Sequence, residues 1–197
     1  MKYGILFKNT PSHVKKEVME GCSYIYGEIS AIERILNDGF VKPSSCIPVI
    51  SAFLGAKKYL VKKDEIIYAK NLGVKTVLFY FDAKNVKFGY FDLFQREINE
   101  LVEKNNEISF IIHLPIDYFS IEELNQMVGF LSKKDVSIMA AIEDKVDVIE
   151  KTHQTLSYLT KYFDTQKIQC LFNTKLEMIR AASILKANHI ENAVYYA

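Results

Sequence analysis

Short apolar runs, rich in β-branched and aromatic residues, recur along the whole chain, and each is followed by a stretch with helical spacing of its apolar positions. Most of these runs are continuously apolar rather than alternating. Continuous runs are typical of parallel strands that are covered on both faces. The pattern therefore predicts parallel strands flanked by helices. The runs are Tyr3–Phe7, Ser23–Ile29, Cys46–Phe53, Thr76–Phe81, Ile108–Leu114, Val136–Ile142, Ile168–Phe172 and Ala193–Tyr196.

The segments between the runs carry the signals of helix ends. Ser120 and Glu123 have the spacing of a capping box, and Thr174 and Glu177 repeat it. The longest helix is predicted over about 145–163, with Asp144 as a candidate for its N-terminal cap. Asp64 is a similar candidate for an earlier helix. Strand and helix are thus expected to alternate throughout.

We expect residues 1–197 to form one domain, because no proline-rich linker, charge block or low-complexity stretch interrupts the alternation. Eight parallel strands with crossover helices close most naturally into an α/β (β/α)8 barrel of the TIM type, and an open doubly wound parallel sheet is the alternative. The sequence ends at Ala197, directly after the last run, so the ring is expected to lack a final helix. Another subunit of a homo-oligomer, or the first helix, would then cover the seam between the last and first strands.

Composition narrows the class of protein. The 197 residues are 49% hydrophobic and 25% charged, with a formal net charge of +1. A near-neutral chain gives no reason to expect nucleic acid as a partner. No apolar run approaches the roughly 20 residues of a membrane span, so no membrane association is expected. Three widely spaced cysteines without a CxxC pair indicate reduced thiols and a cytoplasmic location, rather than disulfides or a thiolate zinc site.

Candidate functional side chains follow from the predicted fold, because the reacting groups of barrel enzymes project from the carboxyl ends of the strands. Glu28 is the most informative, since it lies within the apolar run Tyr24–Ile29, where an unpaired carboxylate would be costly to bury. It needs either a structural partner such as Lys8 or a role in binding or catalysis. The other polar residues near strand ends are Asn9, Ser30, Ser51, Asp82, His113, Asp117, Glu143, Asp144 and Asn173.

Glu28, His113 and Glu143 form the candidate catalytic set. His113 lies in the apolar run Ile111–Leu114, where a histidine is either a hydrogen-bonded core residue or a ligand. Glu28 or Glu143 would act as general base and His113 as the complementary acid or ligand. The same three side chains could converge with Asp82 on one divalent cation, for which oxygen-rich ligation favours Mg²⁺ or Mn²⁺. Candidate ligand-binding residues are Lys8, Asp82, Asn173 and Lys175.

Several common barrel chemistries lack their residues. A Schiff-base aldolase needs a lysine inside a strand, and none of the apolar runs has an interior lysine. The connection Asn173–Lys175 lacks the glycines of the usual phosphate grip, although a helix start at Thr174 beside Lys175 could hold an anion. No GxGxxG, Walker or GxSxG motif supports a nucleotide cofactor or serine hydrolysis. The aromatic-rich stretch 79–94 predicts core and helix packing rather than a stacking platform.

Three segments carry a family resemblance: Tyr26–Ile29, Ile47–Ile50 and Ala69–Val77. A glutamate on the second strand and an Ala-x-x-Leu-Gly turn before the fourth make this part similar to the xylose-isomerase-like barrels, which include sugar-phosphate isomerases and epimerases. The resemblance covers about the middle third of the chain. It implies a pocket role for Glu28 and places His113 and Glu143 where the family has metal or substrate ligands. The family's late His and Glu are not reproduced.

Two hypotheses about function follow. The first is a small barrel that binds a small polar metabolite, a sugar or sugar phosphate, and performs isomerisation, epimerisation or lyase chemistry by proton transfer. The second is a non-catalytic regulatory or scaffolding barrel that acts through its helical surface or an oligomer. The first is the leading hypothesis, whereas the short inventory of ionisable groups at the strand ends and the missing final helix are points for the second. Placement of Glu28 and His113 in one cavity would favour the first.

Overall fold

Parallel strands form a closed barrel in the order β1 to β8 in a computed structural model of the chain. The structure describes residues 1–7, 22–39, 41–51, 55, 57–142 and 147–196. The barrel confirms the predicted TIM-type fold, and the open sheet is excluded because β8 pairs with β1. The strands are β1 Lys2–Leu6, β2 Tyr24–Glu28, β3 Cys46–Ile50, β4 Thr76–Phe79, β5 Ser109–Pro115, β6 Val136–Ile142, β7 Ile168–Phe172 and β8 Asn192–Tyr196.

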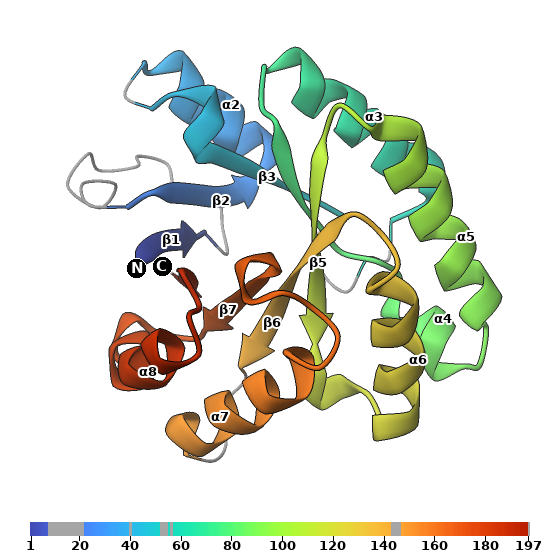
Figure 1. Cartoon of the computed structure of the whole chain (residues 1–197). Helices are drawn as coiled ribbons and strands as arrows, with labels where there is room; N and C mark the ends of the chain where they lie inside the picture. The colour runs from blue at the N-terminus through green and yellow to red at the C-terminus, as the bar shows by residue number, and fades with distance from the viewer. Residues whose placement is uncertain (8–21, 40, 52–54, 56, 143–146, 197) are drawn as a thin grey trace.

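Helices surround the barrel as an outer ring (Figure 1). Those of the described residues are α2 Ile29–Asn37, α3 Tyr59–Asn71, α4 Ala83–Lys87, α5 Phe91–Val102, α6 Ile121–Leu131, α7 Val148–Leu159 and α8 Lys175–Ala187. None of these helices combines the length and the apolar composition needed to cross a bilayer. The first predicted helix, one of the two elements expected to cover the seam between β8 and β1, lies outside the described residues.

Helix starts were predicted well at two caps and wrongly at two others. Both capping boxes form, at Ser120 with Glu123 and at the start of α8. The cap of α7 is Asp147, whose side chain accepts from the Ile149 N–H at 2.9 Å, and not Asp144, which lies outside the described residues. Asp64 lies inside α3, which begins at Tyr59 and whose buried stripe starts at Lys62, so the predicted cap at Asp64 is wrong.

Two apolar layers hold the barrel together. Outward-facing strand residues pack with the helices in one large cluster, and inward-facing residues form a second, smaller cluster inside the barrel. Tyr26 fills part of this interior, and its hydroxyl donates to Gln169 Oε1 at 2.9 Å. Gly4 leaves room for that ring, because a Cβ there would lie 2.6 Å from Tyr26 Cε2. The part of the interior nearer the amino ends of the strands is therefore packed. This leaves the carboxyl ends of the strands as the place for a site.

Candidate functional site

The strand pairings define which side chains share a height inside the barrel. With the shear of about eight residues that this fold has, inward-facing residues at one height come from alternate strands. One such layer contains Leu6, Val49, His113 and Leu171. The next layer towards the carboxyl ends contains Glu28, Tyr80, Ala141 and Tyr196. We call this upper layer, together with His113 and Asn173, the mouth of the barrel.

His113 is the buried polar group at the mouth. It is 5% exposed, and its Nε2 atom has no hydrogen-bond partner among the described residues. Its ring stacks on Tyr80, with ring centroids 4.0 Å apart and an interplanar angle of 12°. A buried nitrogen without a partner is costly, so this atom is poised to bond a group that enters the mouth.

Burial also fixes the charge of His113. Removal from water lowers the pKa of the imidazole from 6.5 to about 3. The ring is therefore neutral at physiological pH, and it cannot serve as an imidazolium acid there. A neutral imidazole can still donate one N–H or accept one hydrogen bond, which changes the chemistry we propose for it from proton donation to polarisation of an oxygen atom.

His113 should make the protein sensitive to acid. The unfolded chain, where the imidazole titrates near 6.5, binds more protons than the folded chain between that pH and about 3. This part of the stability is complete above pH 6.5 and falls as pH drops, by up to about 1.4 kcal/mol per pH unit. Urea unfolding at several pH values in this range would give the free energy of unfolding as a function of pH. That free energy should change less steeply with pH in His113→Phe than in the wild type, and as steeply as in the wild type in the exposed His153→Phe. Equal slopes in all three proteins would contradict this assignment.

Glu28 is the last residue of β2 and the residue before α2. It is partly buried, and its side chain makes no capping hydrogen bond to that helix. The alternation along β2 places it on the inward face with Tyr26, on the same mouth as His113. Lys8, the proposed structural partner of this carboxylate, lies outside the described residues. Glu143 also lies outside them.

The remaining predicted residues lie around the same end. Asp82 is the N-cap of α4, and its side chain accepts from the Lys84 N–H at 3.1 Å. Asn173 directly follows β7 and is partly buried. Lys175 is the exposed first residue of α8. Within the described part of the chain, no three His, Cys, Asp or Glu side chains gather as metal ligands, and the proposed ligand set includes Glu143, which is not described.

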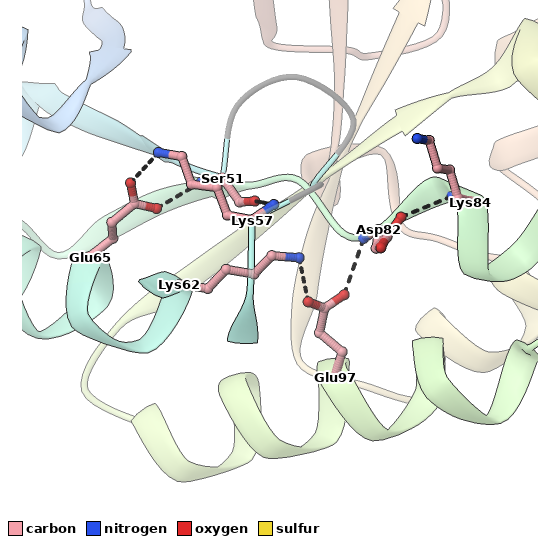
Figure 2. Close-up of polar contacts among 7 residues, drawn as sticks. All are labelled: Ser51, Lys57, Lys62, Glu65, Asp82, Lys84 and Glu97. Atoms are coloured by element: carbon pink, nitrogen blue, oxygen red, sulfur yellow. Dashed lines mark hydrogen bonds and ion pairs between the residues drawn. The ribbon is translucent and has the colours of Figure 1, made fainter. Parts of the chain in front are cut away.

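A buried ion pair lies behind the end of β4 (Figure 2). Lys62 of α3 is fully buried, and its ammonium group pairs with a carboxylate oxygen of Glu97 on α5. The other oxygen of Glu97 accepts from the backbone N–H of Asp82 at 3.2 Å. The ammonium also lies 5.4 Å from the centre of the Phe79 ring. The hydrogen bond to Asp82 and the contact with Phe79 lie on either side of Tyr80 in the chain. Together they anchor the segment that carries Tyr80 into the mouth.

A second, more exposed copy of this arrangement anchors the end of β3. Glu65 accepts from the backbone N–H of Ser51 at 3.0 Å and from the Lys57 ammonium at 2.5 Å (Figure 2). Ser51 is fully buried and has a positive φ of 58°, a conformation that such contacts must hold in place. In both copies a helical glutamate joins a lysine to a backbone N–H within three residues of a strand end.

Sequence reasoning missed Tyr80, Lys62 and Glu97 as contributors to this site. Tyr80 lies two residues beyond Leu78, so strand alternation would have placed it inside the barrel instead of in the helix packing predicted for 79–94. Lys62 shares a helical stripe with Ile66 and Ala69, both buried. A lysine on an apolar stripe signals a buried partner. Glu97 has no comparable signal, because only the fold brings α5 to α3.

Lysine placement bears on the reactions open to this barrel. Lys2 is the only lysine in the described strands, and it is exposed at the start of β1. Lys62 is buried, but it faces the helices rather than the barrel interior. The described residues place no lysine inside the mouth for a Schiff base, and Lys8, just beyond β1, lies outside them.

A separate cavity of about 450 Å³ lies at the opposite end of the barrel. It is lined by residues of α8 and of the starts of β1 and β8, among them Tyr3, Lys186 and His189. Its charged side chains are exposed to solvent. Because the strands begin here, the cavity lies away from the mouth that contains His113.

Comparison with known proteins gives likeness of fold. No family model matches the chain, and no curated protein sequence matches it. The solved structure of "QR15, an Aldolase" is 14% identical, with a TM-score of 0.73 over 98% of this chain and 89% of its own. The deoxyribose phosphate aldolase from Aeropyrum pernix, described as a unique tetramer, is 13% identical, with a TM-score of 0.70 over 98% and 83% of the two chains. These matches bear out the barrel expected from the resemblance and do not single out the xylose-isomerase-like family.

Proposed function

We propose that this barrel binds a small polar carbonyl compound, a sugar or sugar phosphate in type, and performs lyase or isomerase chemistry by proton transfer at its mouth. The unpartnered Nε2 atom of buried His113 carries the proposal, because such an atom needs a hydrogen-bonding ligand to complete it. The likeness in fold to two aldolases supports the lyase class.

Each residue has a separate role in this scheme. Glu28 is the proposed general base, and Glu143 is the alternative base. The neutral imidazole of His113 would donate its N–H to the carbonyl oxygen and stabilise the negative charge that develops there. Removal of a proton from the carbon next to the carbonyl leads to isomerisation or epimerisation. In the lyase reaction the base takes the proton of a hydroxyl group on the β-carbon, and the bond between the α- and β-carbons breaks to give a carbonyl product and an enolate. The enolate oxygen would accept from the His113 N–H, and the base would return its proton to the α-carbon.

Ligand-binding roles for Asp82, Asn173 and Lys175 follow from their positions near the carboxyl ends of β4 and β7. Lys175 and the first turn of α8 would attract a phosphate group if the substrate carries one. Lys8 is proposed for the same purpose. Binding of Mg²⁺ or Mn²⁺, a cytoplasmic location and self-association stay predictions.

A ligand screen tests the proposal. Hydroxyaldehydes, ketoses and sugar phosphates, with and without Mg²⁺ or Mn²⁺, would be added in a thermal-shift assay, where a ligand at a hundred times its Kd stabilises the fold by about 2.7 kcal/mol. We expect at least one compound to raise the Tm and to shift the imidazole NMR signals of His113. If no compound does both, the proposal fails, and the non-catalytic hypothesis replaces it.

A further inference from the structure

The peptide group between Phe81 and Asp82 is held from two sides. Glu97 Oε2 accepts its N–H at 3.2 Å. Gly55 lies against its carbonyl group so closely that a Cβ on Gly55 would be 1.9 Å from the Phe81 oxygen. Tyr80, which stacks on His113, is the residue before Phe81 in the chain. The backbone N–H of Tyr80 itself donates to the Ile50 carbonyl at 3.1 Å.

Burial of the Lys62 charge at this point costs free energy of desolvation. Its side chain is fully buried, and that of Glu97 is only 12% exposed. The loss of water around two charges offsets most of their attraction, so an apolar pair of similar volume often gives a fold of equal or greater stability. What the ion pair adds is a carboxylate held in one place, with one oxygen directed at the Asp82 N–H.

We propose that Lys62 and Glu97 are positioning residues, which fix the end of β4 and thereby hold the Tyr80 ring against the imidazole of His113. The importance of this arrangement for catalysis rests on the proposed function above. The outer pair of Lys57 and Glu65 holds the end of β3 in the same way, but the Lys57 side chain is 44% exposed. Water can replace that ammonium group, whereas the Lys62 ammonium has no access to water.

The test compares two double variants that both remove the buried charges. Lys62→Met with Glu97→Met removes the acceptor of the Asp82 N–H, whereas Lys62→Met with Glu97→Gln leaves an amide oxygen as acceptor. The readout is the NMR signal of the His113 ring in the ligand-free protein, which reports ring stacking and tautomer. The chain has only four histidines, so assignment is direct. Lys57→Met is the matched control from the exposed pair.

We expect the Met/Met variant to fold with its His113 signals shifted and broadened, the Met/Gln variant to keep signals close to wild type, and Lys57→Met to have no effect. Unchanged signals in the folded Met/Met variant, or equal changes in both double variants, would overturn the positioning role. Because no ligand is present, this result is independent of the ligand screen.

A second comparison covers the case in which the Met/Met variant does not fold. Asp82→Pro removes the N–H and leaves the buried pair intact, and the φ of −72° at Asp82 suits proline. Asp82→Ala removes the same capping side chain but keeps the N–H. The His113 signals should change more in Asp82→Pro than in Asp82→Ala, and equal spectra would overturn the inference.

Discussion

Replacement of Glu28 by Gln should slow turnover of a substrate found in the ligand screen by about 10²- to 10⁴-fold, the usual contribution of a positioned general base. The amide keeps the shape of the side chain but cannot take a proton. Binding should weaken much less than turnover, because Gln can still accept a hydrogen bond. Steady-state kinetics would therefore show a large fall in kcat with a small change in KM.

Replacement of His113 by Asn should reduce both binding and turnover. The amide can donate a hydrogen bond, but it is shorter and cannot stack on Tyr80 as the imidazole does. Matched controls are Glu33→Gln, at a carboxylate of α2 that bonds Tyr68, and His153→Asn, at an exposed position of α7. Both controls should behave as wild type. Full activity in the variant that combines Glu28→Gln with His113→Asn would refute the assignment of this mouth as the active site.

The fold was open to prediction because its signals are local and repeat. Each strand of a parallel barrel is buried on both faces, so it appears as a continuous apolar run, and β6 and β7 have the bounds that these runs indicate. The capping box at Ser120 involves residues three apart and forms as expected. Errors occur where a helix start depends on burial by other elements, as at α3, whose first turn precedes Asp64.

The candidate site was predictable only in part, because its main features depend on pairs far apart in the sequence. The run around His113 indicates a buried ring, but neither its stacking on Tyr80 nor its unpartnered Nε2 follows from the residues nearby. Lys62 and Glu97 are 35 positions apart and meet only because α3 and α5 flank β4. Sequence patterns locate strand ends, whereas charge and hydrogen bonding at those ends depend on the packed structure.

Gly55 supports the site by its lack of a side chain, and Gly55→Ala should destabilise the fold by about 3 kcal/mol or more. Two penalties add at this position. The φ of +71° is unfavourable for alanine, and the new Cβ would lie 1.9 Å from the Phe81 oxygen and 2.6 Å from the Asp82 nitrogen. Both atoms are backbone, so no side-chain rotation relieves the contact. Urea unfolding would measure the loss.

Gly89→Ala separates the two penalties. Gly89 has a similar φ of +80°, but nothing lies within 4 Å of a Cβ built there. This variant should lose only about 1–2 kcal/mol, the cost of the left-handed conformation. The difference between the two variants isolates the contact with the Phe81–Asp82 peptide group. A folded Gly55→Ala protein should also show shifted His113 signals, since a displaced Phe81–Asp82 peptide group would carry Tyr80 with it. Equal losses of stability in the two variants would mean that Gly55 does not constrain this peptide group.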